Sequence, residues 1–166
     1  MTERKEDQYL YGEIDGKGFI KFVGNATMKN SKTLEDLFEK LFKSDKKEIV
    51  LDFEECNYMD STMLGLIAKT AIKFKKSWGL AIYALNTPNI ILTSLKSTGV
   101  NKLMEFIEDE NLKVVEVKKL ETKDYDNKEE KTKHILEAHK TLMGLSDENK
   151  EVFKNVVNLL EGELNK

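Results

Sequence analysis

The residues best placed to do chemistry are three adjacent polar side chains, Asp60, Ser61 and Thr62. They stand between an apolar segment and an amphipathic helical one. Asp and Ser are common helix N-caps, and loss of a cap costs about 1 kcal/mol. A serine at a helix start also lies beside free backbone N–H groups and the positive end of the helix dipole, so it can accept a phosphate. The sequence therefore leaves two interpretations of Ser61, a helix cap or a phosphorylated switch.

Cysteine and histidine, which often do chemistry in proteins, are in weaker positions. Cys56 has no histidine or basic neighbour in sequence, which predicts an inert, buried thiol. His134 and His139 lie five residues apart and so on different faces of a helix, which predicts surface or hairpin-packing residues rather than a metal pair. The motifs CxxC, HExxH, GxGxxG and the P-loop are absent. The sequence predicts no catalytic residue, no metal site and no cofactor.

Hydrophobic periodicity predicts the elements that must position these residues. Strand-like runs lie at 9–14, 19–23, 48–53, 80–85 and 114–117, and helical ones at 34–42, 64–78 and 90–95. Strands that alternate with helices favour the α/β class, here a small mixed β-sheet flanked by helices.

Local signals refine this prediction. Asp15 to Gly18 predict a hairpin turn between the first two strands, and Gly79 predicts the end of the second helix. The nearly continuous apolar run 48–53 is typical of a central strand covered on both faces. Thr87 before Pro88 predicts a capped start for the third helix.

The last part of the chain differs from the rest. Nine of the thirteen residues in 121–133 are charged, which predicts a solvated linker or the exposed start of a helix. Two amphipathic runs follow, divided by Gly144, and Ser146 can cap the second. We expect a domain at 1–119 and a charged linker with a C-terminal helical hairpin at 120–166. The hairpin cannot bury its apolar stripe alone, so it must cover an edge of the domain or form a homodimer.

Composition limits the classes of partner. The chain has 166 residues, 40% hydrophobic and 34% charged, with a net charge of −3 that residues 120–166 account for. Nucleic-acid binding usually needs a basic patch, and no apolar run reaches the roughly 18 residues of a membrane span. The charged N-terminus has no signal-peptide pattern, and a lone cysteine suits a reducing compartment. We expect a cytoplasmic protein that binds neither nucleic acid nor membrane.

The segments IVLDF and YMDSTMLG, followed by a lysine-containing amphipathic helix, resemble the STAS domain of anti-sigma factor antagonists. Gly24 after the second strand and the segment STGV at 97–100 extend the resemblance, which covers about residues 9–117.

The resemblance implies a bacterial interaction module without enzymatic activity that acts in signal transduction and transcription regulation. Ser61 would be the phosphoacceptor, with Asp60 shaping the site and Thr62 as a second candidate. An anti-sigma factor serine kinase would phosphorylate Ser61 and bind only the unphosphorylated form, and a PP2C-type phosphatase would reset the switch. The expected partner-binding residues are Met63 and Gly65 at the start of the second helix, together with Asn25 and Thr27 in the loop after the second strand.

Two positions depart from the family pattern. Many relatives have glycine where this chain has Met63, and many carry an acidic residue shortly after the glycine that ends the second strand, where this chain has Asn25, Ala26 and Thr27. Met63 would alter which kinase fits. The missing acidic residue and the long C-terminal tail favour an alternative, an unphosphorylated STAS scaffold subunit of a larger signalling or lipid-transport assembly. An α/β enzyme or small-ligand binder is a third hypothesis, but no nucleophile, base and orienting group converge in the sequence.

Overall fold

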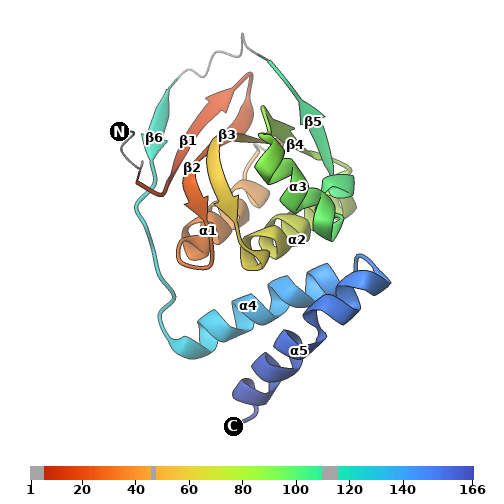
Figure 1. Cartoon of the computed structure of the whole chain (residues 1–166). Helices are drawn as coiled ribbons and strands as arrows, with labels where there is room; N and C mark the ends of the chain where they lie inside the picture. The colour runs from red at the N-terminus through yellow and green to blue at the C-terminus, as the bar shows by residue number, and fades with distance from the viewer. Residues whose placement is uncertain (1–5, 46–47, 110–115) are drawn as a thin grey trace, which may run out of the picture.

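The computed structural model describes residues 6–45, 48–109 and 116–166 (Figure 1). Six strands form one sheet in the order β5-β4-β3-β2-β1-β6. The strands are β1 (Gln8–Ile14), β2 (Lys17–Ala26), β3 (Ile49–Met59), β4 (Ile82–Leu85), β5 (Met104–Ile107) and β6 (Val117–Lys119). The strands from β2 to β5 run parallel, and β1 pairs antiparallel with both β2 and β6. The predicted mixed α/β fold is confirmed.

Three helices of the domain pack on one face of this sheet. They are α1 (Ser31–Phe42), α2 (Ser61–Trp78) and α3 (Asn89–Thr98), and a short 3-10 helix, η1 (Val100–Leu103), follows α3. Residues of all three join the main hydrophobic core with strand residues such as Ile20, Leu51 and Ala84. The opposite face carries a small cluster made of strand residues. The expectation that the start of β3 is a central strand covered on both faces is confirmed, since Leu51 lies in the main core and Val50 is buried in the cluster of strand residues.

Local turn signals in the sequence are mostly confirmed. Asp15 and Gly16 have positive φ angles and make the β1–β2 turn, and Gly79 ends α2 with a φ of 68°. Thr87 does not cap α3, because Pro88 is the N-cap and the Thr87 hydroxyl has no hydrogen-bond partner.

The edges of the sheet differ from the sequence prediction. Strand β5 was not predicted, because it is only four residues long and half of it is exposed. The last strand was predicted at 114–117. Within the described residues it begins at Val117 and extends to Lys119, while 114 and 115 lie outside them.

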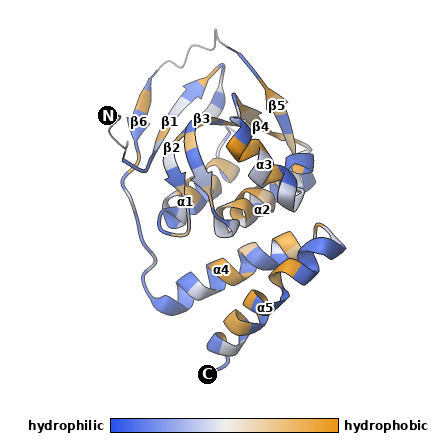
Figure 2. Cartoon of the chain, viewed as in Figure 1, coloured by the Kyte–Doolittle hydropathy of each residue, from blue (hydrophilic) through white to orange (hydrophobic). Residues whose placement is uncertain are grey.

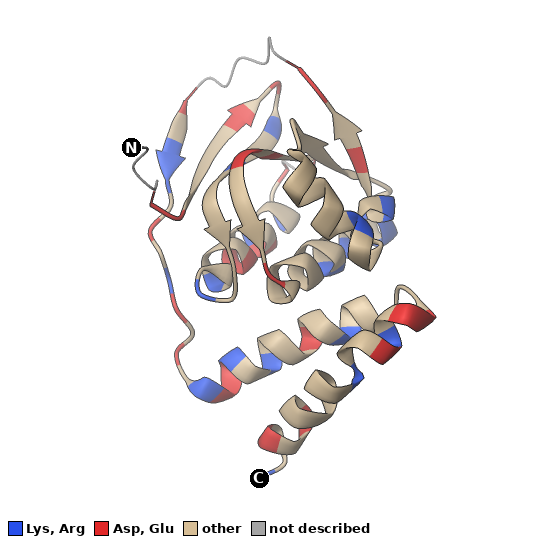
Figure 3. Ribbon diagram, viewed as in Figure 1, with Lys and Arg blue, Asp and Glu red and all other residues tan. Residues whose placement is uncertain are grey.

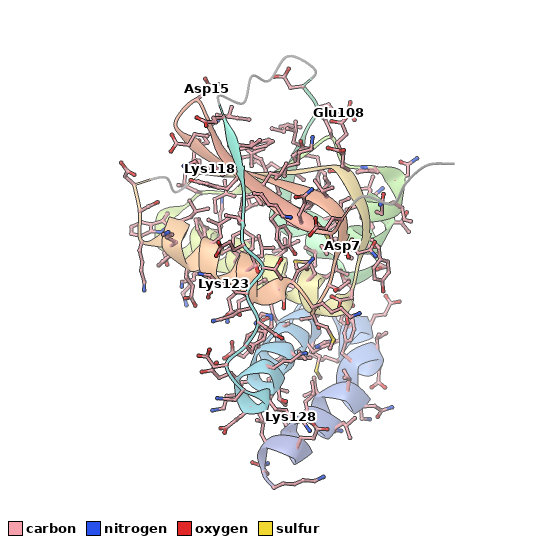
Figure 4. The ribbon with its side chains drawn as sticks, turned by 90° about the vertical axis from the view of Figure 1, so that its left-hand side faces the viewer. Asp7, Asp15, Glu108, Lys118, Lys123 and Lys128 are labelled. Carbon is pink, nitrogen blue, oxygen red and sulfur yellow. The ribbon has the colours of Figure 1, made fainter. Side chains whose placement is uncertain are left out.

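The C-terminal hairpin lies on the far side of the helix layer from the sheet (Figure 1). It consists of α4 (Lys128–Met143) and α5 (Asp147–Leu164), capped by Asn127 and Ser146. The linker runs down one side of the domain, past Lys123, to α4 (Figure 4). Along it, the Lys123 backbone N–H donates to Thr33 Oγ1 at 2.8 Å. The hairpin itself docks on its own domain, since Lys69 Nζ of α2 donates to Glu137 Oε2 of α4.

Both helices of the hairpin carry apolar residues and charged residues of both signs. Apolar residues recur along both helices (Figure 2), and Leu136, Leu142 and Val157 are buried. Residues of both charge signs are distributed along α4 and α5 rather than gathered by sign (Figure 3). Among the described residues, no helix combines the length and apolar character that a membrane crossing requires.

Candidate functional site

The candidate site lies where the parallel strands β2 and β3 end and α2 begins. Asp60 is the N-cap of α2, and its Oδ1 accepts from the Met63 backbone N–H at 2.9 Å. Its Oδ2 accepts from the Met28 backbone N–H at 2.8 Å, and its own N–H donates to the Ala26 carbonyl at 3.2 Å. Asp60 therefore links the start of α2 to the loop that follows β2.

The loop between β2 and α1 is held by Asn30. Its Oδ1 accepts from the Tyr9 hydroxyl at 2.7 Å and from the Thr27 N–H at 3.0 Å, and its Nδ2 donates to the Asn25 carbonyl at 2.9 Å. Burial raises the pKa of Tyr9, and the nearby Cys56, Asp60 and Asp7 raise it further. Tyr9 therefore remains a protonated donor, which fixes the loop beside Asp60.

A carboxylate does lie at this loop, although the sequence after Gly24 has none. Asp7 Oδ1 accepts from the Asn25 N–H at 2.9 Å. Gly24 permits this approach, since its φ is 78° and a Cβ there would lie 2.4 Å from Asp7 Oδ1. Sequence reasoning missed Asp7 because it precedes the strand β1, eighteen residues from Asn25. The pairing of β1 with β2 brings the two together.

Ser61 is the first residue of α2, and its hydroxyl is not used for capping. Ser61 Oγ lies 2.8 Å from His139 Nε2 in α4. His139 Nδ1 lies 2.7 Å from the Ile135 carbonyl, which can only accept, so Nδ1 carries a proton. In the neutral ring Nε2 is then an acceptor, and the Ser61 hydroxyl donates to it. The helix-cap interpretation of Ser61 is wrong, because Asp60 is the cap.

Helix α4 crosses α2 closely at this point. A Cβ added to Gly65 would lie 2.3 Å from the Ala138 carbonyl oxygen, so Gly65 allows the two helices to touch. One turn further along α2, Lys69 Nζ donates to Glu137 Oε2 at 2.6 Å. The first two turns of α2 are therefore covered by α4.

The seven predicted site residues lie together, but three of them are buried. Thr62 and Met63 are buried at 3% and 0% exposure, and Gly65 is buried under α4. The accessible part consists of half-buried residues, namely Asn25, Thr27, Asp60 and Ser61. In this conformation Met63 is a core residue and does not form part of the surface.

The cysteine and the two histidines are buried and make packing contacts. Cys56 is buried, and burial raises the pKa of its thiol to about 12. His139 packs edge-on against Phe153 of α5, and His134 pairs with Glu35 of α1. Within residues 6–45, 48–109 and 116–166, no group of three or more His, Cys, Asp or Glu side chains is placed to hold a metal ion.

The STAS domain model matches residues 11–112, more than half of the chain. The chain belongs to the STAS domain family. The matched segment ends before β6, so α4 and α5 lie outside it. A search of curated proteins gives no match.

Solved STAS structures share the fold. The crystal structure of a candidate anti-sigma factor antagonist from Thermotoga maritima, TM1081, is 15% identical, with a TM-score of 0.52 over 61% of this chain and 86% of that one. Unphosphorylated SpoIIAA, an anti-sigma factor antagonist, is 14% identical, with a TM-score of 0.50 over 62% and 89%. The NMR structure of TM1081 is 14% identical, with a TM-score of 0.52 over 65% and 86%. At these identities the likeness establishes the fold alone.

Proposed function

We propose that this STAS protein is an anti-sigma factor antagonist switched by phosphorylation of Ser61. Unphosphorylated, it binds an anti-sigma serine kinase in the cytoplasm. Phosphate on Ser61 ends this binding, and a PP2C-type phosphatase restores it. The protein itself does not act as an enzyme, and it takes part through residues 1–119.

The observation that carries the proposal is the position of Ser61. It is the first residue of α2, half-buried, and free of the capping role that Asp60 fulfils. A phosphate there meets the positive end of the helix dipole and adds about −1.5 to −2 charges at the surface. Asp7 supplies a carboxylate at the β2–α1 loop, as an acidic residue after the glycine does in many relatives.

Mass spectrometry of the protein isolated from its own cells tests the proposal. We expect a fraction with one phosphate on Ser61, removable by phosphatase. Thr62 should carry none, because its side chain is buried. The proposal fails if no phosphate is found under several growth and stress conditions.

Binding measurements with the captured kinase provide the second test. Ser61→Asp should abolish binding, whereas Ser61→Ala should keep binding and lose the switch. Ser97→Asp, which adds the same charge at an exposed position of α3, should bind like the wild type. Equal binding by Ser61→Asp and Ser97→Asp would contradict the proposal.

The covered position of Ser61 favours a second candidate, a STAS scaffold subunit that is never phosphorylated. Helix α4 occupies the face that a kinase would need. Its signature would be a stable stoichiometric complex in pull-downs with no phosphate on any form of the protein.

A further inference from the structure

We infer that the α4–α5 hairpin is an internal competitor for the Ser61 face, so that a partner reaches Ser61 only when the hairpin has moved away. The inference rests on the proposed function for the identity of that partner. The cover itself is a property of this chain and can be tested without it.

The contact is specific to the residues that the switch would use. His139 Nε2 accepts a hydrogen bond from the Ser61 hydroxyl at 2.8 Å, and the Ala138 backbone packs directly against Gly65. A kinase would have to bring the terminal phosphate of ATP to Ser61 Oγ, beside which His139 already lies. Docked hairpin and bound kinase are therefore mutually exclusive on this face.

Further contacts hold the hairpin along the whole helix layer. His134 of α4 pairs with Glu35 of α1, and the Tyr125 hydroxyl of the linker lies 3.5 Å from Ser31 Oγ of α1. At the other end, Asn149 Nδ2 donates to the Thr98 carbonyl and to the Leu142 carbonyl, both at 2.8 Å. The hairpin thus has a defined docked position, anchored on α1, α2 and α3.

The docked position is also one that can open. The least buried parts of the tail are α5, where Asn149 and Val157 are the buried residues, and the segment 116–124 before α4, most of which is exposed. Helix α4 itself has six buried residues among its 16. The Lys69–Glu137 ion pair lies at the surface. Elements with few buried contacts open at lower free energy than the core does.

Phosphate on Ser61 and the docked hairpin exclude each other for the same geometric reason. A phosphoryl group on Oγ would take the place of the His139 ring. By linkage, whatever favours the open hairpin favours phosphorylation, and phosphorylation favours the open hairpin. The hairpin therefore adds a second level of control to the switch.

Thiol labelling of Ser61→Cys in the full chain tests the cover. The reference is Ser97→Cys, at an exposed position of α3, and the native Cys56, which is buried, reports global unfolding. We expect Cys at 61 to react at least about tenfold more slowly than Cys at 97 while Cys56 stays unreactive.

Gly65→Ala in the Ser61→Cys background should open the cover. The new Cβ would meet the Ala138 carbonyl, while alanine strengthens helix α2 itself. Its matched control is Gly162→Ala on α5, where a Cβ meets nothing within 4 Å. We expect about tenfold faster labelling at 61 in Gly65→Ala and no change in Gly162→Ala.

Two results would overturn the inference: equal labelling at 61 and 97 in the full chain, or slow labelling at 61 that Gly65→Ala leaves unchanged. If Cys56 is labelled together with the cysteine at 61 in the Gly65→Ala variant, that variant unfolds globally. Ala138→Arg, which alters the hairpin alone, is then measured in its place with the same expected outcomes. If labelling confirms that the hairpin covers Ser61, this result stands even if Ser61 is never phosphorylated. If labelling refutes the cover, the proposal that Ser61 is phosphorylated is unaffected.

Discussion

At the residue scale, the division of roles between Asp60 and Ser61 is the main result. A single polar triplet offers both a cap and a hydroxyl, and the structure assigns the cap to Asp60. This could not be predicted from the sequence, because Asp and Ser are about equally good N-caps. The assignment depends on where β3 ends, and helix and strand boundaries are uncertain by a residue or two.

Asp60→Ala should therefore destabilise the domain more than its exposure suggests. It removes the acceptor for Met63 N–H and also the acceptor for Met28 N–H, so we expect a loss of about 1–2 kcal/mol in the free energy of unfolding. Asp60→Asn keeps an oxygen for Met63 and should lose less. Urea denaturation measures the free energy of unfolding of both variants. Equal losses in the two variants would show that the hydrogen bond from the Met63 N–H does not contribute to stability.

The approach of Asp7 to the β2–α1 loop leads to a prediction for Gly24. Alanine at φ 78° costs about 1–2 kcal/mol through backbone strain alone. At Gly24 the new Cβ also meets Asp7 Oδ1, which should add about 1–3 kcal/mol. Gly79→Ala is the matched control, since its φ is 68° and its Cβ meets nothing within 4 Å. Similar urea midpoints for the two variants would contradict the role of Asp7.

At the element scale, periodicity predicted the elements whose side chains alternate between core and solvent. Helices α1 and α2 were predicted from such a pattern, whereas β1 and β2 were predicted from short runs of aromatic and branched residues and β3 from its nearly continuous apolar run. Strand β5, with Glu105 and Phe106 exposed, has too little pattern to be recognised. The amphipathic pattern also predicted α4 and α5. It could not predict their docking position, because Ser61 and His139 meet across 78 residues of sequence.

The α1–α4 contact through Glu35 and His134 predicts an effect of acid. Burial alone would raise the pKa of Glu35, but the hydrogen bond and charge of His134, together with Lys69 and Lys32, hold it below its ordinary value of 4.5. A carboxylate with a lowered pKa stabilises the folded chain above about pH 4.5, and this contribution is lost as the pH falls through the folded-state pKa.

Thermal unfolding from neutral pH down to about pH 3 measures this effect. Glu35→Gln, which cannot titrate, should show a shallower acid-side fall in unfolding temperature than the wild type. Glu39→Gln, an exposed position on the same helix, is the matched control and should follow the wild type. An acid-side fall in Glu35→Gln as steep as in the wild type would contradict a role for this pair.

At the scale of the whole molecule, the hairpin makes this chain more than a STAS domain. The domain contains Ser61, the proposed phosphoacceptor, and α4 of the hairpin contacts it, so the two parts must be considered together. The hairpin also leaves a second surface. Val152 and Leu159 of α5 are 64% and 65% exposed, although Phe153 on the same helix packs inward against His139.

This exposed apolar stripe leads us to propose that α5 also mediates a homodimer, since helices commonly bury such stripes against another helix. We expect light scattering to give the mass of a dimer for the full chain at high concentration and of a monomer for Val152→Asp with Leu159→Asp. Asn155→Asp with Asn158→Asp adds the same charge to exposed polar positions of α5 and should remain a dimer. A wild-type monomer at high concentration would refute the homodimer and leave the cover over Ser61 as the hairpin's proposed role.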